Sequence, residues 1–415
     1  MPRTVHVIGA GLAGLSAAVR LAGRGLAVVV HEAAPHAGGR CRSYRDAALN
    51  MVIDNGNHLV LSGNRAALEY LRCLGAEDRL VGPAQAAFDF VDLATHERWT
   101  LRPNAGLLPW WVFDARRRVP ATSPFDYLPA GKLLWAGPGQ RIDAILACRG
   151  LVYERLLRPV LLAALNTDPP EASAALAGAV IRETLAKGGA ACRPLIARDG
   201  LGAAFVEPAL RYLATHSAIV RFGHRLRAIG SGSGRVQNLD FGEDTVALGP
   251  DDAVVLAVPP PVATALIPGL SAPTEFRAIV NAHFRLPPPA GFPPMIGVVN
   301  GTVEWIFAFP DRLSVTISGA DRLLDTPREE LAALIWAEVA AVGNLDVPMP
   351  AWQIVRERRA TFAATPAQNA LRPGGRTAWP NLALAGDWTA TGLPATIEGA
   401  IRSGNTAAEI VGPST

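Results

Sequence analysis

A glycine-rich turn close to the start of the chain has the spacing of a phosphate-binding element. It reads Gly9-Ala10-Gly11-Leu12-Ala13-Gly14. Gly9 permits a tight turn, Gly11 lets the backbone approach a pyrophosphate, and Gly14 allows a helix to pack closely on a strand. The first turn of that helix would offer free N–H groups and the positive end of its dipole to the phosphates. By itself this pattern also fits ordinary glycine turns.

The segments on either side of the turn place it in a βαβ unit. Thr4–Ile8 is a β-branched run, Leu15–Arg24 has a helical pattern, and Leu26–His31 is a second apolar strand. Glu32 follows that strand, where a carboxylate accepts hydrogen bonds from ribose hydroxyls and would repel the 2′-phosphate of NADP. We therefore predict dinucleotide binding, with Ala33 beside Glu32 in the same segment.

Two further blocks have residue types suited to a cofactor. Gly38-Gly39-Arg40 combines another close backbone approach with a guanidinium that suits a phosphate oxygen. Near the other end of the chain, a predicted strand is followed by Gly386-Asp387, and then by Pro394-Ala395-Thr396 at the start of a predicted helix. No cysteine or histidine lies between residues 380 and 400, which argues against covalent flavin attachment at this motif.

Together the three blocks resemble the squalene-associated FAD-dependent desaturases, the hydroxysqualene dehydroxylase family of the amine oxidase and phytoene desaturase superfamily. Residues 54–58 and 165–170 extend the resemblance. It implies noncovalent FAD, with Asp387 at the ribityl or phosphate region and the 394–396 backbone at the pyrimidine end of the flavin. A helix N-terminus there would stabilise negative charge on the reduced ring. Asn57 stands where the family usually has glutamine. The predicted cofactor contacts also include Asn57, His58 and Leu226.

The order of elements predicts an α/β fold, with a Rossmann-type FAD-binding domain and an inserted mixed α+β substrate domain. The FAD-binding domain is predicted to be discontinuous, and the substrate domain to combine a helical segment with an antiparallel sheet. Within the latter, Ile142–Leu165 is predicted as one long apolar helix, and residues 83–138 have no clean periodicity. The predicted boundaries are 1–80, 200–265 and 375–415 for the first domain, and 81–199 and 266–374 for the second.

The resemblance implies reductive removal of an allylic hydroxyl from hydroxysqualene, which gives squalene. A hydroxyl leaves poorly unless it is protonated, so a general acid is needed. Aromatic faces would stabilise the allylic cation, and reduced flavin would deliver hydride. His58 is our first candidate for the acid, and Asp54 either orients it or caps a turn. Both residues also fit purely structural roles.

The implied partner is a long-chain, thirty-carbon isoprenoid, together with an electron donor that the sequence does not identify. Residues 107–113 are rich in leucine and tryptophan and precede Arg116-Arg117-Arg118, a pattern that suits a membrane surface and equally a buried segment beside a solvated charge run. We expect a cytoplasmic protein, peripheral on the inner face of the membrane. A net charge of +3 argues against nucleic acid, and the cysteines lack metal-ligand spacing, so no metal site is predicted.

Two alternatives stay open at this stage. A carotenoid-type desaturase or an amine oxidase would share the cofactor motifs, and amine oxidases of this superfamily often place a lysine near the flavin's reactive nitrogen. The chain has only two lysines, Lys132 and Lys187. The second alternative is a non-catalytic flavin-binding protein, which would bind the cofactor without turnover.

Overall fold

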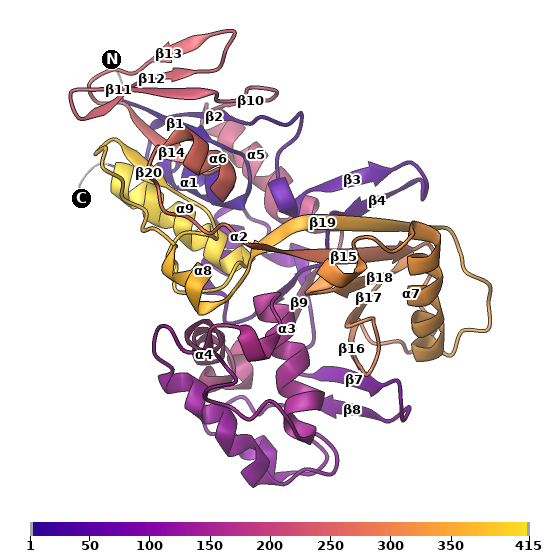
Figure 1. Ribbon diagram of the computed structural model, residues 1–415. Coiled ribbons are helices and arrows are strands. Elements are labelled where there is room, and N and C mark those ends of the chain that lie inside the picture. The colour runs from indigo at the N-terminus through magenta and orange to yellow at the C-terminus, as the bar shows by residue number, and fades with distance from the viewer. Residues whose placement is uncertain (1–2, 413–415) are drawn as a thin grey trace.

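Residues 3–412 are described by a computed structural model, and a five-stranded parallel sheet lies at one end of the molecule (Figure 1). Its inner strands are largely buried, as expected for a parallel sheet covered on both faces, whereas the edge strand that contains Ile219 is exposed. The sheet draws its strands from distant parts of the sequence. The strand order is β10 (Ile219–Arg221), β2 (Ala27–His31), β1 (Thr4–Ile8), β14 (Ala253–Leu256) and β20 (Leu382–Leu384).

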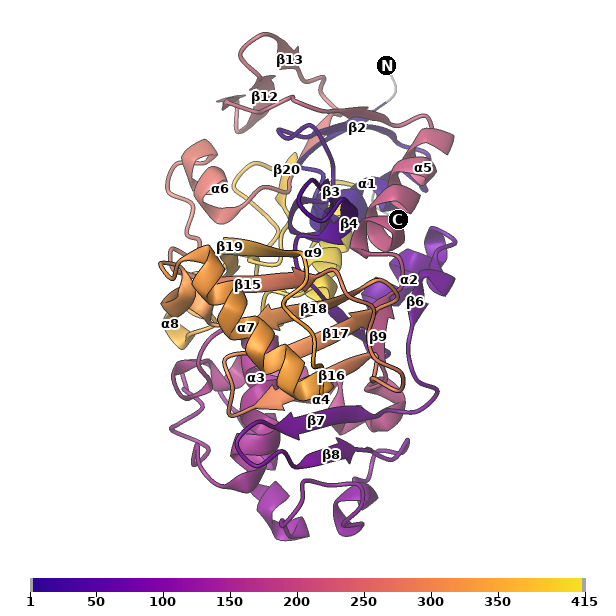
Figure 2. The same ribbon diagram turned by 90° about the vertical axis from the view of Figure 1, so that its right-hand side faces the viewer.

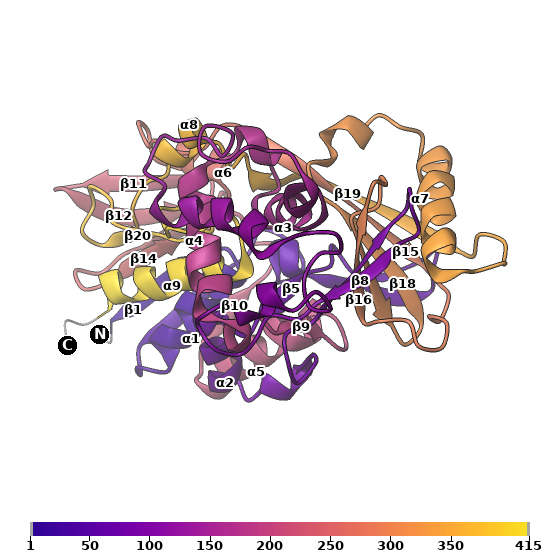
Figure 3. The ribbon, with the colours of Figure 1, turned by 90° about the horizontal axis from the view of Figure 1, so that it is seen from below.

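Two helices from opposite ends of the chain, α1 (Leu12–Ala22) and α9 (Ile397–Val411), pack closely beside this sheet (Figure 3). Small residues allow the close approach. A Cβ atom on Gly404 would lie 2.0 Å from Ser16 Oγ, and that hydroxyl contacts the Ile401 carbonyl oxygen at 3.3 Å. The other helices of this part are α2 (Arg65–Cys73), α5 (Glu207–Thr215), which follows a π-helical turn at Gly202–Val206, and α6 (Pro260–Leu266).

A seven-stranded sheet forms the second large unit, and α7 (Arg328–Gly343) lies across one face of it (Figure 2). Most neighbouring strands are antiparallel, but β16 and β7 are parallel. Two of its strands, within residues 88–101, lie in the stretch without clean periodicity, where no strand was predicted. The order is β19 (Trp352–Phe362), β15 (Phe276–Phe284), β18 (Arg312–Ile317), β17 (Trp305–Phe309), β16 (Met295–Val299), β7 (Phe88–Asp92) and β8 (Arg98–Leu101).

Three small sheets complete the fold. One is a two-stranded hairpin and two have three strands each, one of which lies at the outer edge of the parallel sheet (Figure 1). A short helix, α8 (Pro366–Ala370), precedes β20. The small sheets contain β3 (Ser43–Asp46) with β4 (Met51–Asp54), β5 (Leu59–Leu61) with β9 (Pro194–Ala197) and β6 (Leu80–Val81), and β11 (Ala228–Gly232) with β12 (Arg235–Asp240) and β13 (Thr245–Ala247).

A helical part lies at the end of the molecule opposite β11–β13 (Figures 1 and 2). The prediction of one helix over Ile142–Leu165 was wrong at its start. Residues 142–150 form turns, because Gly150 has a left-handed φ of +92° and Ile142 N donates to the Ala172 carbonyl oxygen instead of within a helix. The elements of this part are η3 (Trp110–Phe113), η4 (Pro124–Trp135), the π-helical η5 (Tyr153–Leu157), α3 (Arg158–Leu165) and α4 (Ala174–Glu183).

Two environments were predicted for residues 107–118, a membrane surface and a buried segment beside solvated charges, and the segment has both exposed and buried apolar residues. Trp110 and Phe113 are exposed, whereas Trp111 and Val112 are buried in the core of the helical part. Within residues 3–412, no helix is long and apolar enough to cross a membrane.

Asn166, at the end of α3, ties the helical part to the seven-stranded sheet. It has a left-handed φ of 49° and is buried. Its Nδ2 donates to Thr361 Oγ1 at 3.0 Å and its Oδ1 accepts from Gly319 N at 2.7 Å. The next residue adds a contact, since Thr167 Oγ1 accepts from Ala364 N. Asn166 and Thr167 therefore join the helical part to the seven-stranded sheet and to the chain that follows β19.

We predict that Asn166→Ala lowers the free energy of unfolding by about 3 kcal/mol. About 1 kcal/mol would come from alanine in a left-handed backbone conformation, which asparagine adopts more easily. The rest would come from buried polar groups that lose their hydrogen-bond partners. Urea denaturation measures the loss. Asn344→Ala is the matched control, since Asn344 also has a φ of 49° but is exposed at the end of α7. Equal losses in the two variants would contradict this account.

Candidate flavin site

The glycine turn between β1 and α1 is shaped by two different constraints. A Cβ atom on Gly14 would lie 1.9 Å from the Gly9 carbonyl oxygen, and one on Gly9 would lie 2.4 Å from the Ala257 oxygen. These two glycines are therefore required by packing inside the protein. A Cβ atom on Gly11, at the N-cap of α1, would meet nothing within 4 Å. Packing does not explain Gly11, whereas close approach of a pyrophosphate to the helix N-terminus does.

Glu32 is held against this turn by backbone donors. Its Oε2 accepts from Ala10 N at 2.7 Å. Its Oε1 accepts from Ala34 N at 2.8 Å, so that Ala33 lies between the carboxylate's own residue and this donor. A carboxylate has further lone pairs, so Glu32 can still accept hydrogen bonds from ribose hydroxyls. The Glu32 carbonyl oxygen also accepts from His224 N, which brings the loop that contains the buried Leu226 next to Glu32.

The Gly38-Gly39-Arg40 block lies directly on the first glycine turn. Gly38 N donates to the Ala10 carbonyl oxygen at 2.8 Å, and Gly11 and Gly38 form a parallel bridge. Gly38 has a φ of +109° and Gly39 of +55°, backbone conformations that favour glycine. The first two blocks, apart in sequence, thus form one backbone surface at the N-terminus of α1.

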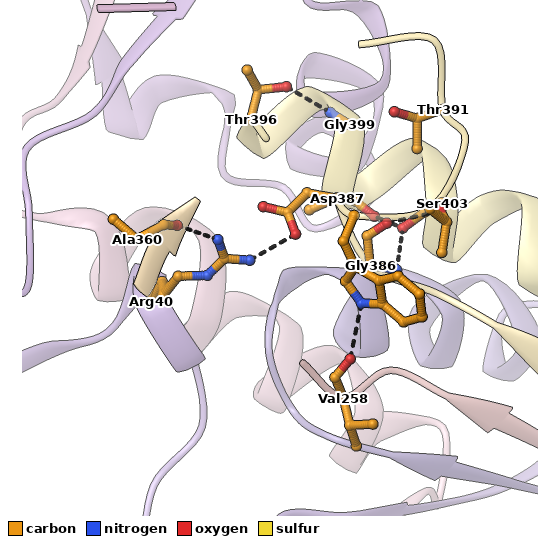
Figure 4. Close-up of polar contacts among 12 residues, drawn as sticks. Arg40, Val258, Ala360, Gly386, Asp387, Thr391, Thr396, Gly399 and Ser403 are labelled. Atoms are coloured by element: carbon orange, nitrogen blue, oxygen red, sulfur yellow. Dashed lines mark hydrogen bonds and ion pairs between the residues drawn. The ribbon is translucent and has the colours of Figure 1, made fainter. Parts of the chain in front are cut away.

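Arg40 joins the third block to this surface (Figure 4). Its Nη2 lies 2.7 Å from Asp387 Oδ1, and its Nη1 donates to the Ala360 carbonyl oxygen. The Asp387 carboxylate is buried, and its negative charge raises the pKa of Arg40 above the usual range. A charge-assisted hydrogen bond of this kind is stronger than a neutral one. All three blocks therefore meet at Arg40.

The N-terminus of α9 is shaped by Thr396 and Ser403 (Figure 4). Thr396 Oγ1 accepts from Gly399 N at 3.0 Å and so caps the helix after Pro394 and Ala395. Gly386 N donates to Ser403 Oγ at 2.8 Å, which fixes the start of the preceding loop on the same helix. The N–H groups of the first turn that this cap does not use can stabilise a negative charge.

Arg372 organises the loop after Asp387 and had no recognisable signal in the sequence. This buried guanidinium donates to the carbonyl oxygens of Asp387, Trp388 and Thr389 and to Thr391 Oγ1. Burial lowers the pKa of Arg372 to about 10, so it remains a cation at neutral pH. It is one arginine among many in this chain, and only the fold shows which carbonyl groups it binds.

Asp54 does not orient His58 in this structure. Its carboxylate accepts from Ser43 Oγ and from Leu201 N, the latter at 2.9 Å, so it fixes the turn before the π-helical segment 202–206. Within residues 3–412 no hydrogen bond joins Asp54 to His58. Of the two sequence-based roles, the turn cap is the one with observed contacts, and burial raises the pKa of Asp54 above its usual value.

His58 lies close enough to the Arg40–Asp387 pair for both charges to affect it. Burial and the Arg40 cation lower the pKa of His58 to about 4, and Asp387 acts in the opposite direction. The imidazole is therefore neutral at pH 7. A neutral imidazole donates one hydrogen bond readily but is a poor proton donor, which weakens the predicted acid role in this state.

Asn57 connects the site to the seven-stranded sheet. Its Nδ2 donates to Thr316 Oγ1 at 3.1 Å, and Thr316 Oγ1 donates to Asn281 Oδ1 at 2.8 Å. Within the described chain, the buried Oδ1 atom of Asn57 has no hydrogen-bond partner. The Asn57 side chain is thus held by β18, and its Oδ1 acceptor is free within the described residues.

Comparison with known proteins gives the class of this fold and site. A sequence model of the family described as flavin containing amine oxidoreductase matches residues 12–412. Among solved structures, cyclohexylamine oxidase from Brevibacterium oxydans superposes with a TM-score of 0.73 at 17% identity, over 99% of both chains. The chain belongs to the flavin-containing amine oxidoreductase family and is a flavin-dependent oxidoreductase.

Closer relatives narrow the family. The chain is 63% identical over 412 residues to a protein of Rhodopseudomonas palustris named hydroxysqualene dehydroxylase, covering 99% of each chain. It is 59% identical over 410 residues to a protein of the same name from Sinorhizobium fredii, covering 99% of this chain and 98% of the relative. Within the larger family, the chain is a member of the hydroxysqualene dehydroxylases.

Two fully buried histidines make the stability of the fold depend on pH. His31, on β2, contacts His6 and His224, and burial lowers its pKa to about 3. His283, on β15, contacts Ser314 Oγ at 2.8 Å, and burial likewise lowers its pKa to about 3. In the unfolded chain both would titrate near pH 6.5.

We predict that the free energy of unfolding falls as the pH drops below about 6.5, because the unfolded state then binds protons that the folded state does not. Each such histidine contributes about 1.4 kcal/mol per pH unit until its folded pKa is reached. His283→Gln should make the slope between pH 6 and pH 5 shallower by about that amount in urea denaturation. His216→Gln, at an exposed position, should leave it unchanged; an unchanged slope in His283→Gln would refute the assignment.

We also predict that Gly11→Ala folds normally but binds flavin at least about tenfold more weakly, a loss of about 1.4 kcal/mol. The added methyl group would meet open space in the protein and would collide only with a bound phosphate. Unfolding of the flavin-free protein measures whether the variant folds normally, and titration with flavin measures its affinity. Gly131→Ala, where a Cβ atom also meets nothing within 4 Å, is the neutral control. Flavin binding by Gly11→Ala equal to that of wild type would disprove the assigned site.

Proposed function

We propose that this chain, with noncovalently bound FAD, removes the hydroxyl group of hydroxysqualene reductively to give squalene. One observation carries the proposal: full-length likeness to proteins named hydroxysqualene dehydroxylase, in a chain whose three glycine blocks meet at Arg40. The division into an FAD-binding domain at 1–80, 200–265 and 375–415, and a substrate domain between these segments, is part of the same proposal.

FAD is the flavin that fits the residues best. Gly11 and the N-terminus of α1 suit a pyrophosphate, and Glu32 suits an adenosine ribose, which FMN lacks. Arg40 and Asp387 would lie towards the phosphate or ribityl portion, and the start of α9 towards the pyrimidine end of the flavin. Noncovalent binding is favoured because the 386–396 loop contains no cysteine or histidine for a covalent link. The proposed contacts are residues 9–14, 32, 33, 38–40, 57, 58, 226, 386, 387 and 394–396.

The reaction breaks the allylic C–O bond and forms a C–H bond, and the hydroxyl departs with one proton as water. Reduced FAD, when bound, supplies the hydride and is left oxidised. The chain's part is to hold the allylic carbon in place, to exclude water and to stabilise charge. The free N–H groups of the first turn of α9 would stabilise negative charge on the ring. Buried aromatic side chains near the site, among them Trp305 and Phe362, would stabilise positive charge on the substrate.

His58 is proposed to hold the substrate hydroxyl by donating a hydrogen bond from one ring nitrogen. Its low pKa makes it a hydrogen-bond donor first, and a proton donor only where nearby negative charge raises that pKa towards neutrality. Asp54 is proposed as a positioning residue, because it fixes the 200–201 turn through Leu201 N.

A long, apolar isoprenoid suits the interior of the helical part. One continuous cluster of buried apolar residues includes Leu133 and Leu156 of that part, and also Trp388 beside the third block. Ala395, at the start of α9, packs against the same cluster. We propose that the substrate reaches this cluster from the membrane surface, on the inner, cytoplasmic face.

The lysines do not favour an amine oxidase. Lys132 is exposed on η4, and Lys187 is exposed on a short 3-10 turn after α4. Neither lies on an element that carries one of the three glycine blocks. The alternative of a lysine close to the flavin, on which the amine oxidase interpretation rests, therefore has no support from the position of either side chain.

The decisive experiment is a single turnover by the reduced holoprotein. We expect anaerobically reduced protein, freed of excess reductant, to convert hydroxysqualene to one equivalent of squalene per flavin, with reoxidation of the flavin at the same rate. Mass spectrometry measures the squalene formed, and the absorbance of oxidised flavin measures the rate of flavin reoxidation.

Gly11→Ala, reconstituted with FAD under the same conditions, should form squalene only in proportion to the flavin it retains. Oxidised wild-type protein with putrescine or cyclohexylamine tests the amine oxidase alternative. Amine oxidation without any squalene formation would overturn the proposed function. Bound flavin without either turnover would leave the non-catalytic alternative in its place.

A further inference from the structure

Exposed, large apolar side chains gather at the outer end of the helical part. Leu107, Trp110 and Phe113 come from η3 and the loop before it, and Phe125, Leu128 and Trp135 come from η4. Between 64% and 81% of each of these six residues is exposed. We call them the end surface; the segment that carries them lies at the bottom of Figure 1, far from β11–β13. A soluble protein rarely presents so many large apolar residues together without a partner.

Buried contacts hold the segment that carries the end surface in place. The exposed apolar residues therefore lie on an ordered segment, not on a frayed loop. Trp111, next to Trp110, is buried and packs edge-on against Tyr127 of η4, with ring centroids 5.4 Å apart. Tyr127 OH accepts from Val119 N at 2.9 Å, and Leu133 of η4 is fully buried. The inner residues of η3 and η4 thus hold the two elements together, while their outer residues face solvent.

The same segment carries the positive charge of the molecule. Residues 102–149 contain seven arginines or lysines and three aspartates, a net charge of plus four, whereas the whole chain has a net charge of +3. The remainder of the chain is therefore slightly negative. Arg116 is 88% exposed, and Lys132 and Arg149 are also exposed. Arg116 and Lys132 lie in sequence among the apolar residues of the end surface, and Arg149 follows them.

We infer that the end surface docks on a bilayer that contains anionic phospholipid. Tryptophan, phenylalanine and leucine beside arginine and lysine suit the interface between headgroups and acyl chains. A second copy of this chain fits less well, because it would bring together two 102–149 segments, each with a net charge of plus four. Since no helix of residues 3–412 can cross a membrane, the contact would be peripheral.

Docking here would connect the bilayer to the apolar interior, a consequence that rests on the proposed function. Trp111 and Leu133, directly beneath the end surface, belong to the cluster that reaches Trp388 at the flavin site. An isoprenoid alcohol dissolved in the membrane would then meet the protein on the side from which this apolar cluster extends towards the site, without exposure of its long chain to water, which would be costly.

The test is sedimentation of the FAD-loaded protein with vesicles of phosphatidylcholine alone, or with a quarter of phosphatidylglycerol. We expect the wild-type protein to bind the anionic vesicles more tightly, with roughly a fivefold contribution from each cation near the surface. Trp110→Ser/Phe125→Ser/Trp135→Ser should lower the partition coefficient at least tenfold on both kinds of vesicle. Arg116→Gln/Lys132→Gln/Arg149→Gln should remove the preference for phosphatidylglycerol.

Leu334→Ser/Val347→Ser is the matched control, since both residues are exposed but lie on α7 or in the loop after it. This variant should bind vesicles as the wild type does. Vesicle binding by the serine triple variant equal to that of wild type would overturn the inference. So would a wild-type dimer in sedimentation equilibrium that the triple variant converts to a monomer, because a second copy would then be the occupant.

A separate measurement distinguishes failure of this inference from failure of the proposed function. With hydroxysqualene dispersed in detergent, the serine triple variant should turn over as the wild type does. With hydroxysqualene embedded in anionic vesicles, its KM should rise at least tenfold while kcat is unchanged. If neither protein forms squalene but only the wild type binds vesicles, the proposed function fails and the docking surface stands.

Discussion

The ion pair between Arg40 and Asp387 joins side chains that lie 347 residues apart in sequence. It links the second glycine block to the third, while the Gly38–Ala10 hydrogen bond links the second block to the first. Asp387 is buried, so removal of Arg40 would leave a desolvated carboxylate without its partner, a costly change. The ion pair therefore joins the second and third blocks directly, while the parallel sheet and the packing of α1 against α9 bring the first and third blocks close together.

In the proposed site, backbone groups more than side chains would face the cofactor. Gly404 lets α9 approach α1 closely, and Gly14 lets α1 approach β1, so that two helix N-termini converge. Arg372 donates to the carbonyl oxygens of residues 387–389 and so holds that loop in place. The polar atoms of the site are thereby fixed before any ligand binds, which lowers the ordering cost of binding.

An oxidoreductase that acts on a hydrocarbon needs a polar cofactor site beside an apolar substrate site. In the proposed arrangement, the boundary between them would run past His58, which lies near the ion pair, and Asn57, which binds the seven-stranded sheet. The sheet and the helical part supply a continuous apolar interior, and the end surface extends that interior to the outside. Membrane docking, substrate passage and hydride transfer would thus be arranged along one direction through the molecule.

By itself, the sequence determined the cofactor side of this protein. The glycine blocks, the strand before each of the two main motifs and the helix after it are local patterns, since turn geometry and strand and helix periodicity act over a few residues. Asn57 and His58 were named from the resemblance to a known family. Strands β7 and β8, the break at Gly150 and the contacts of Arg372 could not, because non-local partners determine them. The contacts of Asp54 and the pKa of His58 were also decided by tertiary structure: a carboxylate takes the donor that the fold brings to it, and an imidazole takes the pKa that burial and a neighbouring Arg40 impose.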